Sequence, residues 1–363
     1  MPGLVVNGQA AATTAPKAPH VVGPTTRTAT RPTNPLPQYL NDEARRTPRE
    51  AFDARRHLAF QPPARVVTMR EIGLEGHGIS PNAVSDPFPL FTHEAVRQMR
   101  AEIFSDEVLR ECQFASTFNK NMIRGMGPAR APFVYSAWKS PELVASISQV
   151  AGVDLVPSID YEIATVNISA DDEEQHQQPM SVERSCADGQ NEKGGDPLGD
   201  GLSAVAWHYD SFPFVCVVML SDCSDMVGGE TALRTASGEV LKVRGPAMGT
   251  AVVLQGRYIE HQALKALGGR ERIAMVTCFR PRSPHARDET VLTGVRAISH
   301  RSDLYAQYTE YRLEALEERV RARLRAERLR ERAARPFDVP GARAWLVEQM
   351  GYLEAMLAEM VDE

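Results

Sequence analysis

Residues 203–281 consist of short β-rich runs separated by turns: SAVAWHYD (203–210), PFVCVVMLSD (213–222), GGETALRT (228–235), GEVLKVRG (238–245), GTAVVLQG (249–256), YIEHQAL (258–264) and RIAMVTCFRP (272–281). Gly, Asp or Ser punctuates these runs at a spacing of about ten residues. Short strands in such an arrangement are typical of a β-sandwich or a β-barrel. The stretch therefore predicts a core of this kind.

Three side chains in this stretch are of the types that bind metal ions. His208 and Asp210 are two residues apart on an extended segment, so both side chains point to the same face. His261 lies on a later strand. Two imidazoles and one carboxylate on one side of a metal leave the opposite positions open, which suits non-haem Fe(II). The pattern therefore indicates a candidate iron site.

Arg272 follows His261 closely enough to begin the next strand if a glycine-containing turn reverses the chain. A guanidinium in that place can bind a carboxylate through two parallel hydrogen bonds. Ala274, Val276 and Cys278 then share its face of the strand. Because these side chains are small, we expect room for a cofactor beside Arg272.

The run from Trp207 to Pro281 resembles the double-stranded β-helix core of iron(II)/2-oxoglutarate-dependent dioxygenases. The matching features are the HxD pair, GGET, the GTAVVLQG strand, the distal His261 and the RIA that begins at Arg272. The resemblance covers roughly residues 135–285. The sequence is similar in particular to fungal dioxygenase-like proteins of secondary metabolism, which carry WHxDSxPFVCVxMLSD and GGETALRT. One branch of that type closes L-valine to an aziridine-2-carboxylic acid.

The resemblance implies that His208, Asp210 and His261 hold iron and are the catalytic residues. It implies that Arg272 pairs with the C5 carboxylate of 2-oxoglutarate, whose C1 carboxylate and keto oxygen chelate the metal while O₂ takes the remaining position. Decarboxylation to succinate and CO₂ then yields an Fe(IV)=O species that abstracts hydrogen from the substrate. The expected substrate is a small molecule, a free valine-like amino acid or a related metabolite, and the expected outcome is aziridine ring closure or hydroxylation.

Five further residues are candidates for contacts with cosubstrate or substrate. Thr165 and Asn167 share one face of the strand before the core, where they can hydrogen-bond the cosubstrate or serve the fold. Arg234 can pair with a substrate carboxylate or form a surface ion pair. Phe212 and Phe133 can line an apolar substrate wall or pack in the core.

Three alternatives stay open. The protein could be a non-catalytic metal-binding β-barrel, although the intact set of two histidines, aspartate and arginine argues against that. It could be a cupin-like metal enzyme without 2-oxoglutarate, although Arg272 and the HxD spacing disfavour it. It could also be a 2-oxoglutarate-dependent hydroxylase of another small molecule or of a protein side chain.

The composition predicts neither a nucleic-acid partner nor a membrane partner. The 363 residues include 41 Lys and Arg against 47 Asp and Glu, a net charge of −6, so the chain has no global attraction to polyanions. No uncharged apolar run approaches the ~18 residues that span a bilayer. The first residues do not resemble a secretory signal, and five cysteines without a CxxC fit a reducing compartment. We therefore expect a cytoplasmic protein.

The regions around the core complete an α+β fold class with flanking N- and C-terminal helices. The sequence predicts a strand at 64–73, a helix at 93–104 capped by Thr92, and a helix at 141–151 that begins after Ser140 and ends at Gly152. The C-terminal helices, 303–334 and 342–361 with Pro336 and Pro340 as breakers, are expected to pack on the core or to form a homodimer contact. The expected organisation is a disordered arm (1–45), a dioxygenase domain (46–302, core 153–282, mobile loop 170–202) and a helical extension (303–363).

Overall fold

The computed structural model describes residues 16–24, 36–117, 119, 121–170, 203–223, 226–243, 247–264, 266–267 and 271–362. The helices are α1 (Gln38–Arg46), α2 (Ala54–His57), α3 (His93–Ile103), α4 (Asp106–Glu111), α5 (Gly127–Arg130), α6 (Pro132–Trp138), α7 (Pro141–Ala151), α8 (Arg301–Arg332) and α9 (Val339–Glu359). Short 3-10 turns lie at Asp160–Glu162 and Arg296–Ile298. None of the helices in these ranges is both long and apolar enough to cross a membrane.

The strands are β1 (Val66–Thr68), β2 (Asn82–Ser85), β3 (Phe88–Pro89), β4 (Gln113–Phe114), β5 (Met122–Ile123), β6 (Leu155–Pro157), β7 (Thr165–Ala170), β8 (Ser203–His208), β9 (Phe214–Met219), β10 (Val227–Gly228), β11 (Thr231–Arg234), β12 (Val240–Val243), β13 (Thr250–Leu254), β14 (His261–Leu264), β15 (Ala266–Leu267) and β16 (Glu271–Pro281). The main sheet has the order β1-β2-β13-β9-β16-β7-β5-β4, with β3 on β13 and β6 on β16. A smaller sheet has the order β12-β11-β14-β8, and β10 pairs with β15. The described pairs are antiparallel.

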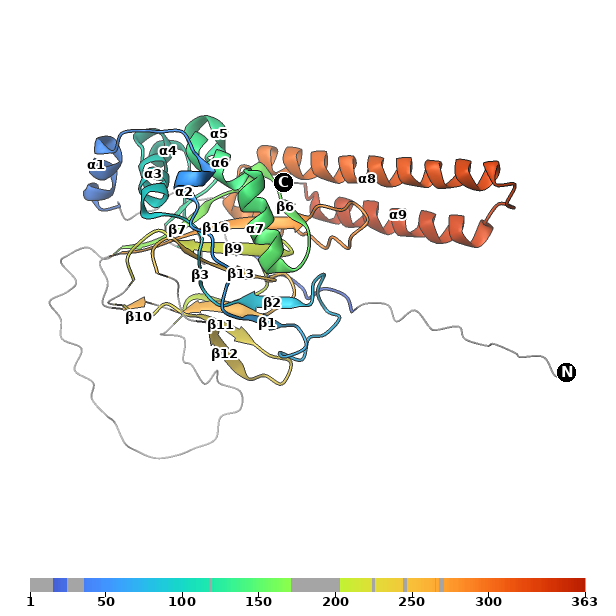
Figure 1. Cartoon of the computed structure of the whole chain (residues 1–363), viewed down its shortest axis with the longest axis horizontal. Coiled ribbons are helices and arrows are strands. Elements are labelled where there is room, and N and C mark those ends of the chain that lie inside the picture. Colours follow the sequence, from blue (N-terminus) through green and yellow to red (C-terminus); the bar gives the residue numbers. More distant parts are fainter. Residues whose placement is uncertain are drawn as a thin grey trace, which may run out of the picture.

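The main sheet separates two hydrophobic clusters. Helices α1 to α7 lie on one side of it, and β11 and β12 of the smaller sheet lie on the other (Figure 1). Along β13, Ala251 and Val253 belong to the cluster on the helix side, whereas Val252 and Leu254 belong to the cluster that contains Leu233 of the smaller sheet. Because both faces are buried, β9, β13 and β16 are almost continuously apolar. The mixed helix-and-sheet class with antiparallel sheets is confirmed.

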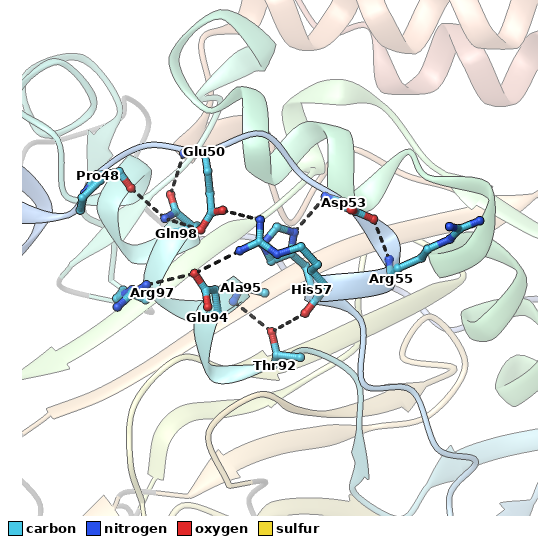
Figure 2. A network of polar contacts seen from close by, with 11 residues as sticks. Pro48, Glu50, Asp53, Arg55, His57, Thr92, Glu94, Ala95, Arg97 and Gln98 are labelled. Carbon is cyan, nitrogen blue, oxygen red and sulfur yellow. Dashed lines mark hydrogen bonds and ion pairs between the residues drawn. The ribbon is translucent and has the colours of Figure 1, made fainter.

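The two helices predicted before the core begin at the predicted residues and end within one residue of the predicted ends. The Thr92 hydroxyl accepts the N–H of Ala95 at 3.2 Å and caps α3. Ser140 accepts the N–H of Leu143 at the start of α7, and Gly152 ends that helix with φ of 70°. Figure 2 shows the polar network that joins the α2 region to α3, including Gln98, which donates to the carbonyl of Pro48 at 2.8 Å.

Two predictions about the N-terminal third hold only in part, and residues 1–15 and 25–35 lie outside the described residues. Residues 1–45 were expected to be a disordered arm, but α1 begins at Gln38 and buries Leu40 and Ala44 against the helix layer. Val21 is also buried, at 4 % exposure. These few apolar residues lie between Pro- and Thr-rich stretches, so no period reveals them. The strand expected at 64–73 contains only β1, because a turn follows it.

Two further boundaries differ from expectation, and one prediction is not tested. The extended run before the 170–202 loop is interrupted by the turn at Asp160–Glu162 and by Ala164, whose φ is 58°. Residues 171–202 of that loop lie outside the described residues. Pro340 does not end a helix: it lies in the first turn of α9, where its missing N–H costs nothing.

Candidate metal centre

The site forms where two strands of the smaller sheet meet. β8 ends at His208 and β14 begins at His261, and these two residues are direct partners in the antiparallel ladder. Directly opposed residues point to the same face of a sheet, so the two imidazoles lie together. Asp210 follows two residues later, and its backbone N–H donates to the carbonyl of Gly256 at 3.0 Å. The ladder and this hydrogen bond position all three side chains.

The three side chains converge on one point. His208 Nε2 lies 3.6 Å from Asp210 Oδ1, and His261 Nε2 lies 3.5 Å from Asp210 Oδ2. The two ring centroids are 4.3 Å apart. One ligand atom of each residue lies within 4.8 Å of the others, and no second group of three such residues is found within the described ranges.

Backbone carbonyls fix the orientation of both imidazoles. His208 Nδ1 lies 2.8 Å from the carbonyl oxygen of Ala206, and His261 Nδ1 lies 2.9 Å from that of Ile259. A carbonyl oxygen only accepts, so the proton is assigned to Nδ1 in each ring. The lone pair of each Nε2 is therefore directed toward Asp210, as in histidines that bind metal ions.

The charges of the site also suit a cation. Burial lowers the pKa of His261 to about 4, so this imidazole is neutral at physiological pH. Burial alone would raise the pKa of Asp210, but His261 and His208 outweigh it and leave the pKa below its ordinary value. Asp210 Oδ2 is buried and has no hydrogen-bond partner in the described part of the chain. A buried carboxylate oxygen without a donor fits a metal ligand.

Gly256 makes room for this arrangement. A Cβ built on Gly256 would overlap Asp210 Oδ2 and would lie 2.7 Å from Asp210 Cγ and 3.1 Å from His261 Cε1. Only a residue without a side chain leaves both ligands in place. The donor set, the unpartnered oxygen and the glycine together fit a divalent transition metal.

Arg272 lies on the facing main sheet. In β16, Ile273 and Met275 pack on the helix side, whereas Cys278 belongs to the cluster between the sheets, so Arg272 shares the inner face with Cys278. Its side chain is half-buried, and burial lowers its pKa. Within the described ranges, its guanidinium makes no hydrogen bond or ion pair. A half-buried guanidinium of this kind is suited to an incoming carboxylate.

Thr165 and Asn167 lie on the same inner face. They are the ladder partners of Val276 and Ala274 in β16. Arg124 Nη1 donates to Thr165 Oγ1 at 3.3 Å, and Asn119 Nδ2 donates to Asn167 Oδ1 at 2.8 Å. The structure therefore gives both side chains protein partners, and their contact with a cosubstrate stays a prediction.

Arg234 points away from the site. Leu233 is the ladder partner of His261 and shares its face, so the neighbouring Arg234 projects from the opposite face of the smaller sheet. Its Nη1 lies 2.7 Å from Glu260 Oε2, and its guanidinium stacks 4.3 Å from the centroid of Trp207. The interpretation of Arg234 as a substrate ligand is corrected: it forms the surface ion pair that was the alternative.

The two phenylalanines do not line an open pocket. Phe133 lies in α6 on the helix side of the main sheet, with its ring centroid 4.9 Å from that of His57. Its assignment to a substrate wall is wrong, because the main sheet separates it from the metal ligands. Phe212 lies between the sheets but is only 1 % exposed, so in this conformation it is a core residue.

Two positioning contacts had no clear signal in the sequence. Arg124 forms a buried ion pair with Glu162, and the Cys278 thiol lies 3.8 Å from Glu162 Oε2. Arg257, next to Gly256, donates to the carbonyl of Glu289 at 2.8 Å and to that of Pro19 at 2.6 Å. The second contact ties the N-terminal segment 16–24 to the base of the site. Only the proximity of Arg257 to the distal histidine hinted at such a role.

Comparison with known proteins gives distant structural similarity only. No protein-family model and no curated protein matches the sequence. Similar solved structures include an oxidoreductase of the 2OG-Fe(II) oxygenase family from Burkholderia pseudomallei (11% identity, TM-score 0.30, covering 47% of this chain and 70% of that one). A prolyl-4-hydroxylase from Pseudomonas putida is also similar (17% identity, TM-score 0.32, covering 53% of this chain and 88% of that one). So is a prolyl 4-hydroxylase from Phytophthora capsici (13% identity, TM-score 0.35, covering 76% of this chain and 89% of that one). TM-scores this low do not assign an activity, so the proposal below rests on the side chains.

Proposed function

We propose that this protein is a non-haem Fe(II)- and 2-oxoglutarate-dependent oxygenase. The observation that carries the proposal is the convergence of His208 Nε2, His261 Nε2 and the Asp210 carboxylate. Arg272 lies on the sheet that faces them and has no hydrogen-bond or ion-pair partner among the described residues. Iron and 2-oxoglutarate, when bound, supply oxygen activation, with succinate and CO₂ as co-products. We further propose that the two facing sheets form a double-stranded β-helix.

Each protein group has a defined task in this proposal. The Asp210 carboxylate offsets part of the charge of the ion, and the two imidazoles complete a three-ligand face that leaves the other side open. The carbonyls of Ala206 and Ile259 hold the imidazoles in the ligating tautomer. Arg272 binds the distal carboxylate of the cosubstrate through paired hydrogen bonds. The apolar side chains between the sheets exclude water from the reacting groups.

The proposed substrate is a small molecule, and free valine-like amino acids are the first candidates. This part of the proposal is supported by the resemblance of the WHYDSFPFVC and GGETALRT segments. Arg234 is engaged by Glu260 and does not supply a contact for a substrate carboxylate. The candidate outcomes are ring closure, which removes two hydrogens, and hydroxylation, which adds one oxygen. A protein side chain is the alternative substrate.

The test is a turnover assay on the purified protein loaded with Fe(II) under exclusion of air. After addition of 2-oxoglutarate, O₂ and pooled amino acids, succinate is quantified and the amino acids are followed by mass spectrometry. Succinate formation that disappears in His208→Ala and in Asp210→Ala supports the proposal. Equal succinate formation in wild type and variants, or none under any condition, contradicts it. Succinate formation without any change in the amino acids contradicts the substrate proposal alone.

A further inference from the structure

The C-terminal helices form an antiparallel hairpin that projects from the β core (Figure 1). Near the core, Tyr352 Oη of α9 donates to the carbonyl of Arg312 of α8 at 3.0 Å. At the tip, Arg330 Nη2 lies 3.3 Å from Asp338 Oδ2. The Arg319 guanidinium stacks 4.2 Å from the centroid of Tyr352. These residues define the seam between α8 and α9.

Each helix also carries an exposed apolar stripe outside the seam. On α9, Leu346, Met350, Leu353 and Leu357 are between 45% and 74% exposed. On α8, Leu313, Val320 and Leu324 are between 38% and 50% exposed. Spacings of three and four residues on α9 place its members on one line along the helix. Most large apolar residues of a monomer are not left exposed in such a line.

The two stripes lie on the same side of the hairpin. On α8, Leu313 directly follows the seam residue Arg312, and Val320 directly follows Arg319. On α9, Leu353 directly follows the seam residue Tyr352. One residue turns a helix by about 100°, so each stripe is displaced from the seam by the same angle and in the same sense. In antiparallel helices, equal displacement brings both stripes to one side.

The other members of the α9 stripe obey the same rule. Met350 follows Gln349 and Leu357 follows Met356, and both preceding residues are buried, at 6% and 7% exposure. The hairpin therefore presents a two-helix apolar face to solvent, which is interrupted on α8 by Glu317 between Leu313 and Val320.

We propose that this face binds the same face of a second copy of the chain. The two hairpins run in opposite directions and form a four-helix bundle. The choice of a second copy as the binding partner follows from the distribution of charge beside the apolar stripe of α8. The edge that is remote from α9 carries Glu310 and Glu314 near the core, and Arg325 and Arg328 toward the tip. Glu317 and Arg321, between them, pair with each other at 2.6 Å. Rotation of a second copy by half a turn brings the acidic half of one hairpin against the basic half of the other.

The edge of α9 has the same polarity. Glu354 lies near the core and Arg343 lies near the tip. Phe337 and Val339 at the tip are 65% and 55% exposed, and in the opposed arrangement they cover the Leu353 region of the second copy. Hairpins aligned in the same direction would instead bring like charges together. The charge pattern thus selects a second copy and its direction.

The size of the face approaches that of a stable interface. α9 contains 21 residues, which corresponds to a length of about 31 Å, and two adjacent helices are about 20 Å wide. The projected area is therefore about 600 Å², and the relief of the side chains increases the area that is removed from water. Stable interfaces bury about 800 Å² per partner.

The oligomeric state of the full-length chain tests the proposal. Light scattering coupled to size exclusion, at several micromolar concentrations, is expected to show a dimer. The double substitution Leu353→Glu with Leu357→Glu should give a monomer with unchanged helical circular dichroism. The control is Ala355→Glu, which adds one negative charge on a side of α9 away from the stripe and should remain dimeric. A wild-type monomer at all concentrations, including one that binds another protein, overturns the proposal, as does a dimer that survives the double substitution.

Charge reversal tests the direction of pairing. Arg325→Glu with Arg328→Glu should weaken the dimer at least tenfold in Kd, because two acidic segments then face each other. Adding Glu310→Arg and Glu314→Arg to the same chain should restore it. Failure of the second pair of substitutions to restore the dimer refutes the antiparallel arrangement. These measurements do not involve iron or 2-oxoglutarate, so their outcome is independent of the proposed oxygenase activity.

Discussion

Gly256→Ala is the smallest change that should disable the metal centre without removing a ligand. The added methyl group would overlap Asp210 Oδ2 and approach Asp210 Cγ at 2.7 Å and His261 Cε1 at 3.1 Å. The carboxylate lies in a buried site, so it must rotate or shift rather than move into solvent. Gly256 does not have a positive φ, so alanine can adopt its backbone conformation and the effect is confined to crowding.

The expected size of the effect follows from the role of groups that orient metal ligands. Loss of such support typically lowers metal affinity by about 10- to 100-fold, which corresponds to about 1.4 to 2.8 kcal/mol. Here the methyl group contacts two ligands at once, so we expect a result toward the upper end. The metal-free protein should fold, since the methyl group displaces only side-chain atoms.

The assay is a titration of Fe(II) into wild type and Gly256→Ala under exclusion of air, with thermal unfolding of the metal-free proteins as a check on folding. Gly351→Ala in α9 is the matched control, because an added Cβ there meets nothing within 4 Å. It should leave Fe(II) affinity unchanged and should stabilise the helix by up to about 1 kcal/mol. Wild-type affinity in a folded Gly256→Ala protein would refute the assignment of Asp210 and His261 as neighbouring ligands.

Substitutions at three arginines separate their roles. Arg272→Ala should raise the apparent KM for 2-oxoglutarate by about 10- to 100-fold, because a charge-assisted hydrogen-bonded pair of about 1.5 to 3 kcal/mol is lost. Arg272→Lys should restore part of the affinity for 2-oxoglutarate. An unchanged KM would contradict the assignment of Arg272 to the cosubstrate site. Arg234→Ala breaks the ion pair with Glu260 on the opposite face, so it should leave succinate formation unchanged and lower the free energy of unfolding by less than about 1 kcal/mol. A raised KM for the substrate would show that Arg234 contacts the substrate. Arg124→Ala leaves the Glu162 carboxylate buried and unpaired, which should cost about 3 to 5 kcal/mol in urea unfolding; a loss below about 1 kcal/mol would contradict the buried ion pair.

The convergence of the three candidate metal ligands could be predicted because their geometry is mostly local. His208 and Asp210 need only an extended segment to share a face, and His261 needs only to begin a neighbouring strand. The inner position of Arg272 follows from alternation along one long strand. The capped helices α3 and α7 were equally predictable, because Thr92 and Ser140 act on residues three positions away.

The failures come from long-range packing. Which face Arg234 occupies is decided by the pairing of Leu233 with His261, and a strand of four residues carries no signal for it. Phe133 is apolar and buried as expected, but sequence alone does not show on which side of a sheet a helix packs. The Arg124–Glu162 pair joins the residue after a two-residue strand to a short turn, and neither element has a period from which contact could be inferred.

The most direct test of the proposed iron centre is an anaerobic titration of Fe(II) with 2-oxoglutarate, followed by the visible charge-transfer absorption of the iron–ketoacid chelate. The wild-type protein should give a saturable band at one iron per chain. His208→Ala combined with His261→Ala should abolish the band. A wild-type protein that gives no band, or a band that persists in the double variant, would contradict the convergence of these side chains on iron.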